Sequence, residues 1–174
     1  MKIQRPFFSR DAKSVAKDLL GKILVRKLNN KEFRAKIVET EAYFGEDDPA
    51  SRASKGKNKI SEMMWEEPGK ILVYNVHKYK MFNIVTGKKD EPSAVLIRAL
   101  EPVNFEGRCS GPGLLSNFLQ IGKNFHGREI FNLKNIWLEE GIKAPKVVES
   151  FRVGVKKDLP EKLRFYIKNN CFVS

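Results

Sequence analysis

Apolar residues recur at two spacings along the chain of 174 residues, and each spacing predicts a different kind of element. Between Ser9 and Gly21 they return every three or four positions, which predicts a helix with Ser9 as its N-cap and Gly21 at its end. Strand-like runs follow at residues 22–28 and 33–43. The asparagines between these runs tolerate the positive φ of a tight turn, so we expect a β-hairpin.

Turn-forming residues divide the rest of the chain into short elements. Residues 44–60 form the longest predicted loop, and its length favours a functional or mobile segment. The pattern at residues 131–138 is ambiguous between element types. Further strands are expected at 70–76, 81–85, 94–100, 147–155 and 163–167, with a loop tip at 77–80 and a helix from Pro112 to Leu119.

Strands dominate this pattern, and most of the connections between them are short. We therefore expect a single α+β domain over residues 1–174, built on a curved, mainly antiparallel β-sheet flanked by helices. No stretch approaches the roughly 20 apolar residues of a membrane-spanning helix, and no apolar segment of a signal peptide follows the first residues. Cys109 and Cys171 are far apart and predict neither a disulfide framework nor a zinc site. We expect a cytoplasmic protein.

Basic residues outnumber acidic ones, with 33 Lys and Arg against 21 Asp and Glu and a formal net charge of +12. This excess favours polyanionic partners such as nucleic acids, although a lysine-rich surface that only aids solubility gives the same total. Aromatic rings can stack on unpaired bases while neighbouring cations hold phosphates. The aromatic and basic residues that alternate in this way are Tyr43, Arg52, Lys55, Lys57, Tyr74, His77, Lys78, Tyr79 and Lys80.

The run from Ile37 to Tyr43 carries two acidic residues in an otherwise apolar strand. Side chains alternate along a strand, so Glu39, Glu41 and Tyr43 share one face. Burying two carboxylates is costly unless each finds a partner. The alternative is that the other face of the strand points inward and that both acids are solvated.

Arg98 lies within a second apolar run, residues 94–100, and a buried arginine requires an anionic partner. Glu39 and Glu41 are the obvious candidates. A carboxylate beside an arginine stays ionised, and it can then act as a general base on water. A purely structural ion pair is the alternative, because structural networks also shift pKa values.

Several kinds of chemistry lack their sequence signatures. The zinc-deaminase motif, the P-loop and the dinucleotide-binding glycine motif are all missing. The chain has only two histidines, His77 and His126, so no His-rich metal site is expected. What remains is hydrolysis driven by a carboxylate, without a metal ion or another cofactor.

Taken in order, these residues resemble the alkyladenine (3-methyladenine) DNA glycosylase family over nearly the whole chain. Each matching stretch is weak by itself, and their shared order makes the resemblance strong. The stretches are Asp18–Arg26, Ile37–Tyr43, Pro68–Gly69, Leu72–Tyr74, Phe82–Ile84, Leu96–Pro102, Cys109–Pro112, Arg152–Val155 and Leu163–Tyr166.

The resemblance implies roles in activating the attacking water and in forming the base pocket. Glu41 corresponds to the general base of the family. Arg98 corresponds to the residue that holds the attacking water together with Glu41 and the backbone carbonyl of Val153. Tyr43 and Tyr74 correspond to the two walls of the base pocket.

The resemblance also implies how bases are selected and how the duplex is opened. Asn83 matches the asparagine that crowds the exocyclic amine of guanine. His77 corresponds to the residue that intercalates into the vacated site, and Tyr79 is its rival because the register is uncertain there by one residue. Arg52 stands nine residues after Tyr43, where the family usually has histidine, so the range of substrates is an open question.

We therefore expect a monofunctional DNA glycosylase that acts as a monomer on double-stranded DNA containing alkylated or deaminated purines. It would flip the damaged nucleotide, hydrolyse the N-glycosidic bond with a water activated by Glu41, and leave an abasic site. Two alternatives remain. One is a non-catalytic nucleic-acid-binding module of the same fold. The other is a carbohydrate-acting hydrolase that uses Glu39 and Glu41.

Overall fold

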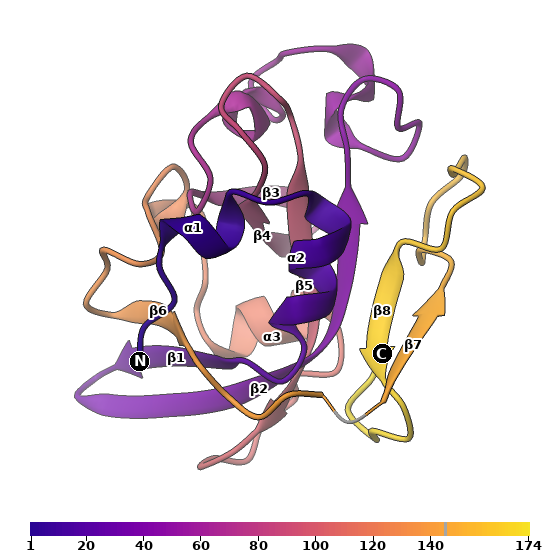
Figure 1. Cartoon of the computed structure of the whole chain (residues 1–174). Coiled ribbons are helices and arrows are strands. Elements are labelled where there is room, and N and C mark those ends of the chain that lie inside the picture. The colour runs from indigo at the N-terminus through magenta and orange to yellow at the C-terminus, as the bar shows by residue number, and fades with distance from the viewer. Residues whose placement is uncertain (145) are drawn as a thin grey trace.

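The main feature of the computed structural model, which describes residues 1–144 and 146–174, is a strongly curved sheet (Figure 1). Its strand order is β3-β4-β5-β2-β1-β6, and β8 adds to β2 and carries β7. Every pairing is antiparallel in the described residues. The strands are β1 Ile23–Leu28, β2 Lys31–Tyr43, β3 Ile71–Val76, β4 Tyr79–Val85, β5 Ala94–Pro102, β6 Ile136–Glu139, β7 Val147–Ser150 and β8 Arg164–Ile167.

The long strand β2 organises the sheet because its two halves have different neighbours. One edge pairs with β5 along most of its length. The other edge pairs first with β1, at residues 31–36, and then with β8, at residues 39–41. The β2–β5 register shifts at Glu39, as expected for a β-bulge, which bends the strand there. The bend therefore lies in the part of β2 that carries Glu39 and Glu41.

Short helices cover the sheet. Helix α2 packs against β2, β5 and β8, and α3 packs against β4 and β5. Their apolar side chains join the inner side of the sheet in one large core. Among the described residues, no helix is long and apolar enough to cross a membrane. The helices are α1 Arg5–Phe8, α2 Ala12–Leu19, α3 Pro112–Phe118 and the 3-10 helices η1 Arg52–Lys55, η2 Glu62–Trp65 and η3 Lys123–Phe125.

A second, smaller cluster of apolar side chains lies under η1 and η2. It contains Met64 and Ala53 from these 3-10 helices, and Leu72, Val85 and Ala94 from β3, β4 and β5. The half-buried rings of two tyrosines, Tyr43 and Tyr74, pack against it. The predicted loop at residues 44–60 therefore contains the 3-10 helix η1. This part of the loop packs on the cluster through Ala53.

The antiparallel sheet and the α+β class are confirmed, whereas some expected boundaries are wrong. Ser9 does not cap the first long helix, because it ends α1 instead. Asp11 is the N-cap of α2, and its side chain accepts a hydrogen bond from the Ser14 amide at 3.0 Å. The ambiguous segment at residues 131–138 contains strand β6.

Two strand predictions also need correction. The strand expected at residues 147–155 ends at Ser150, because Arg152 leaves the sheet to bury its guanidinium among acidic side chains. The loop tip expected at residues 77–80 contracts to a two-residue turn, since Tyr79 already pairs with Val76. His77 takes a positive φ of 52° in that turn.

Candidate active site

Strands β2 and β5 bring both predicted acids and the predicted arginine together in the interior. Glu39 and Glu41 are both 0% exposed, and Arg98 is 8% exposed. The expectation that the two acids could be solvated is therefore wrong. Arg98 reaches both carboxylates: its Nε lies 3.1 Å from Glu39 Oε1, and its Nη1 lies 3.5 Å from Glu41 Oε2.

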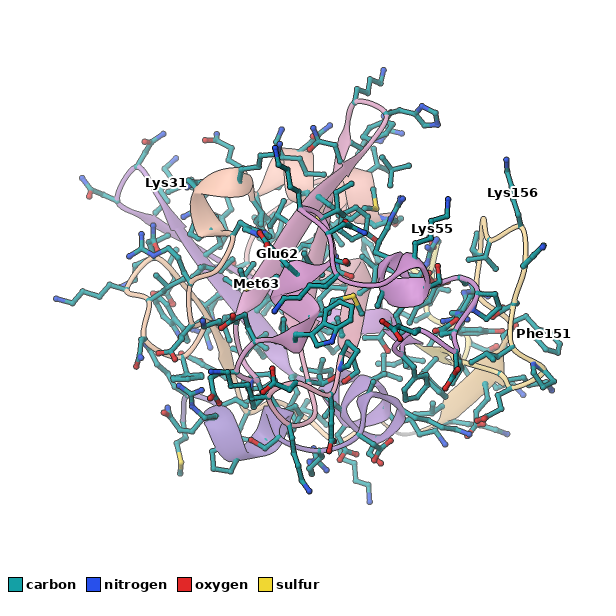
Figure 2. All side chains as sticks on the ribbon, turned by 90° about the horizontal axis from the view of Figure 1, so that it is seen from above. Lys31, Lys55, Glu62, Met63, Phe151 and Lys156 are labelled. Atoms are coloured by element: carbon teal, nitrogen blue, oxygen red, sulfur yellow. The ribbon has the colours of Figure 1, made fainter. Side chains whose placement is uncertain are left out.

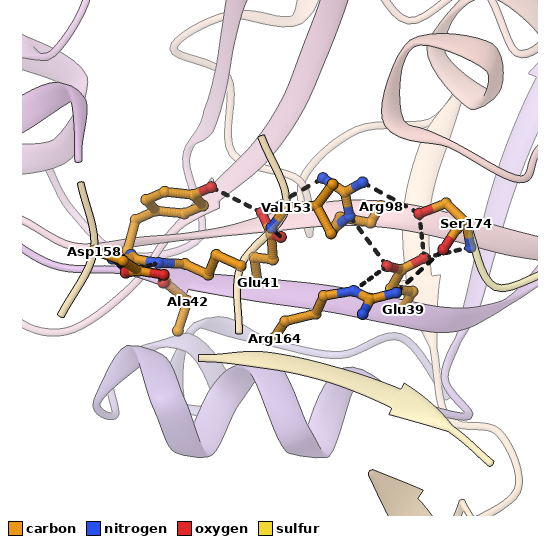
Figure 3. A network of polar contacts seen from close by, with 10 residues as sticks. Glu39, Glu41, Ala42, Arg98, Val153, Asp158, Arg164 and Ser174 are labelled. Atoms are coloured by element: carbon orange, nitrogen blue, oxygen red, sulfur yellow. Dashed lines mark hydrogen bonds and ion pairs between the residues drawn. The ribbon is translucent and has the colours of Figure 1, made fainter. Parts of the chain in front are cut away.

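Glu39 is saturated with hydrogen-bond donors. Oε1 accepts from Arg98 Nε and from Arg164 Nε, the latter at 2.6 Å, while Oε2 accepts from the amide and the hydroxyl of Ser174, both at 2.7 Å (Figure 3). Burial by itself would raise the pKa of Glu39, but the bonds from Ser174 and Arg164 and the charge of Arg98 outweigh it, so the pKa is lowered. Glu39 is thus an ionised structural anchor that ties β8 and Ser174 to β2.

Glu41 has fewer partners in an equally dry place. The Val153 amide donates to Oε1 at 2.7 Å, and the Tyr43 hydroxyl donates to Oε2 at 2.8 Å (Figure 3). Burial raises the pKa of Glu41 above the usual glutamate value, although Arg98, Val153 and Tyr43 oppose this shift.

This difference gives Glu41 a capacity that Glu39 lacks. A carboxylate has about four lone-pair sites, and three donors leave room on Glu41 for a proton from water. A raised pKa also makes Glu41 a stronger base when it is ionised. The geometry therefore suits a general base held in one orientation by Val153 and Tyr43.

Two tyrosines lie beside this carboxylate, and each ring is covered by an arginine. Arg152 Cζ lies 4.5 Å from the centroid of the Tyr43 ring, and Arg52 Cζ lies 4.7 Å from that of Tyr74. Burial and the charge of Glu41 raise the pKa of both phenols, which stay protonated. The site thus offers two neutral aromatic rings close to a buried acid.

An ion network absent from the sequence predictions supports this side of the site. Arg152 donates to both oxygens of Asp48 at 2.7 Å, to the Ala42 carbonyl at 2.9 Å, and through Nε to Asp158 at 3.0 Å. Burial would lower the pKa of Arg152 and raise that of Asp48, but their mutual hydrogen bonds reverse both shifts. Arg152 and Asp48 therefore form a buried ion pair, with Asp158 as a second acidic partner of the guanidinium.

The remaining predicted residues occupy β3, β4 and their turn. Asn83 is 2% exposed, and its Nδ2 donates to the Leu72 and Met81 carbonyls at 3.3 and 3.2 Å. His77 is exposed at the β3–β4 turn. Tyr79 is half-buried against α3, where a Cβ on Gly113 would lie 2.5 Å from Tyr79 Cδ1.

Comparison with known proteins gives a consistent result over the whole chain. The pattern of the family described as Methylpurine-DNA glycosylase (MPG) matches residues 6–171. The chain belongs to this family. A relative from Aeropyrum pernix, provisionally named a 3-methyladenine DNA glycosylase, is 39% identical over 99% of this chain and 92% of its own length. Relatives with the same provisional name from Legionella pneumophila (strain Corby) and Natranaerobius thermophilus are 41% and 37% identical, over 99% and 100% of this chain and 98% and 99% of their own lengths.

For this glycosylase family member, the structure brings most of the predicted site residues together. Glu41, Arg98, Tyr43 and Val153 form one contact network. Val153 touches Glu41 through its N–H, and the role predicted for its carbonyl stays a prediction. Arg52 stacks on Tyr74.

Sequence reasoning missed the acids and arginines that hold the site in place. Asp48 lies in the loop predicted at residues 44–60, where no role was predicted for it, and Asp158 gave no signal. Arg152 and Arg164 fall within the stretches that carry the family resemblance, which was the one available sign of their importance. Burial of an arginine that is remote in sequence from its partners is not visible in a local pattern.

Proposed function

We propose that this protein is a monofunctional DNA glycosylase that flips alkylated or deaminated purines out of duplex DNA and hydrolyses their N-glycosidic bond. The observation that carries the proposal is Glu41, a fully buried carboxylate with a raised pKa and with oriented donors on both of its oxygens. Membership of the methylpurine-DNA glycosylase family supports the same chemistry.

The electrostatics favour a DNA substrate. The net charge is +12, and a cavity of about 340 Å³ beside Tyr74 is lined by Lys59, Lys123 and His126 without an acidic side chain. Nδ1 of His126 accepts from the Val73 amide at 3.1 Å, so a neutral ring carries its proton on Nε2 and can donate to an anion. Phosphates next to a flipped nucleotide suit such a cavity.

Within the site, Tyr43 and Tyr74 would stack on the flipped purine. Their electron-rich faces favour a cationic alkylated ring by about 0.5–2 kcal/mol. Asn83 would disfavour normal guanine, and His77 at the exposed turn would fill the gap in the duplex.

The bond changes in the proposed reaction balance without a cofactor. The oxygen of a water held by Glu41, Arg98 and the Val153 carbonyl bonds to the sugar C1′, and Glu41 takes the proton that this water loses. The bond between C1′ and the purine nitrogen breaks, and the base leaves with the electron pair, which neutralises a cationic lesion. A neutral lesion such as hypoxanthine leaves as an anion and takes up a proton from solvent. The transition state resembles an oxocarbenium ion, and the products are a free base and an abasic site.

The test is single-turnover release of free base from duplexes that carry 3-methyladenine, 7-methylguanine, hypoxanthine or ethenoadenine, with Glu41→Gln as the matched variant. We expect the variant to fold and bind DNA while excision falls by about 10²–10⁴-fold. Strand breaks should appear only after alkali, because the enzyme leaves an abasic site.

The alternatives predict other outcomes. A wild-type protein that binds damaged DNA and releases no base would be the non-catalytic module. A near wild-type rate for Glu41→Gln would move the general base elsewhere, with Glu39 as the first suspect. The four donors on Glu39 argue against a carbohydrate hydrolase with two working acids, because this carboxylate has no free position for substrate.

A further inference from the structure

Arg152 is the anchor of the loop that follows β7. Its guanidinium is 0% exposed and forms a two-pronged contact with Asp48, joined by a bond to the Ala42 carbonyl and by bonds to Asp158. The residues beside it are exposed: Phe151 by 54% and Val153 by 46%. This part of the loop is therefore anchored by the hydrogen bonds and ion pairs of the Arg152 guanidinium and not by buried apolar side chains.

The same guanidinium touches the site at two places, and the chain beside it makes a third contact. It lies over the Tyr43 ring and binds the carbonyl of Ala42, the residue between Glu41 and Tyr43 in β2. The next residue after Arg152 is Val153, whose amide donates to Glu41. Figure 3 shows these groups in one row along β2, with Asp158 at the far end from Glu39.

Burying an arginine with two carboxylates carries a large desolvation penalty, which a loop anchored by apolar contacts avoids. An apolar contact of similar size often gives equal or greater stability, so a buried ion cluster is weak evidence for a role in stability alone. A planar guanidinium, however, fixes direction as well as distance, because its donors form a rigid fork. Directional control is what a general base requires from its hydrogen-bond donors.

We propose that Arg152 is a positioning residue of the glycosylase reaction, which holds the Val153 amide on Glu41 and the Tyr43 ring in place as a wall for the base. The proposal rests on the proposed function, since it assigns Glu41 as the general base. Asp48 and Asp158 serve this role by fixing the fork in the orientation that places Val153.

The test compares Arg152→Lys with Arg26→Lys. Lysine keeps the charge and loses the fork. Arg26 is a matched control, because it is also buried, at 5% exposed, and donates to backbone carbonyls, among them that of Leu119 at 2.9 Å. It lies on β1, which pairs with a different part of β2 from the one that carries Glu41. Both variants should lower the melting temperature.

The deciding measurement is the pKa of the Glu41 carboxyl group in the free protein. It is obtained by following the NMR signal of the carboxyl carbon as pH changes, and the signal is assigned by its loss in Glu41→Gln. Arg98, Glu39 and Tyr74 also act on this carboxyl, and none of them is substituted in either variant. Tyr43 also donates to it, so a displaced Tyr43 ring in Arg152→Lys would raise the Glu41 pKa in the same direction. Loss of the Val153 donor should raise the Glu41 pKa by about one unit, the worth of a hydrogen bond to a charged group. Arg26→Lys should leave it unchanged.

Activity supplies an independent readout. In Arg152→Lys, the acid limb of the single-turnover rate should move to higher pH by the same amount, and the plateau should fall by about tenfold or more. An unchanged Glu41 pKa in a folded Arg152→Lys protein would overturn the proposal even if the wild type excises bases. If the Glu41 pKa shifts in Arg152→Lys but the wild type releases no base, the positioning of Glu41 by Arg152 is upheld and the proposed function is rejected.

Should Arg152→Lys fail to fold, Asp158→Asn gives the milder test. Asp158 Oδ1 accepts from Arg152 Nε and from the Leu159 amide, and an asparagine oxygen preserves one acceptor there. The Glu41 pKa should rise in the same direction by a smaller amount. No change in this variant would count against the role of the network.

Discussion

At the scale of single residues, the site separates two glutamates that are two positions apart on one strand. Both carboxylates are fully buried, so desolvation acts on both. Four strong donors reverse it for Glu39, while a weaker set leaves the Glu41 pKa raised. The donors of one carboxylate are thus saturated, and the other keeps a free position for the proposed role as general base, with Arg98 shared between them.

Glu39→Gln should lower thermal stability more than it lowers the single-turnover rate. The folded-state pKa of Glu39 is lowered, so its contribution to folding is fully present above the unfolded-state pKa and is lost as pH falls through the folded-state value. The difference in melting temperature between wild type and variant should therefore be large at neutral pH and shrink on acidification. A variant with wild-type melting temperature and abolished catalysis would exchange the roles of Glu39 and Glu41.

Arg52→His should broaden excision toward neutral lesions and weaken binding to DNA. Imidazole can accept a hydrogen bond from a neutral base, whereas guanidinium only donates and adds a fixed charge beside a cationic lesion. The exposed Arg52 stacks on Tyr74, so the substitution also uncovers part of that ring. Single-turnover rates on ethenoadenine and 7-methylguanine duplexes test this, with both proteins compared. Identical lesion profiles would show that residue 52 does not set specificity.

At the scale of elements, periodicity was enough to predict the sheet and most of its strands, because each strand buries an apolar face. Periodicity could not predict element boundaries that are set by contacts between residues far apart in the sequence. The strand predicted through residue 155 stops before Arg152, whose partner Asp48 is more than a hundred residues away. The N-cap moved from Ser9 to Asp11 because a short helix, α1, precedes it.

The site was predicted to a similar extent. The acids, the arginine and Tyr43 share a face of β2 and β5 that alternation could find. The role predicted for Glu41 came from the family resemblance and not from the strand pattern, because the donors to the two acids come from β8, Ser174 and the loop at Val153. No local pattern reports which of two neighbouring carboxylates will receive these long-range bonds.

The β3–β4 turn makes a prediction of its own. His77 is exposed at the turn and Tyr79 is packed on α3, so His77→Ala should impair function and Tyr79→Ala should impair stability. An intercalating side chain matters only where a duplex must be held open. His77→Ala should therefore slow excision from double-stranded DNA more than from single strands, measured as the ratio of the two rates. An equal loss on both substrates would argue against intercalation.

At the scale of the whole molecule, the proposed site elements and part of the positive charge share one side. Figure 2 shows Lys55 of η1 on the side of the loop that carries Phe151 and Lys156, and Lys31 at the opposite end of the molecule. The same loop positions Val153 against Glu41. A duplex bound over this side would place its phosphates near η1 and a flipped base near the tyrosines.

This arrangement predicts that affinity for undamaged duplex falls steeply as salt rises, and that the two lysines differ in their contribution. Each cation that contacts a phosphate releases a counterion, and the logarithm of the binding constant then falls with the logarithm of the salt concentration by about 0.9 per contact. Lys55→Gln should reduce this slope by about one unit. Lys31→Gln removes the same charge from another exposed lysine, at the far end, and should leave the slope unchanged. If net charge alone governs binding, both variants will lower affinity equally, so equal slopes in a salt titration would refute a DNA-binding side at η1.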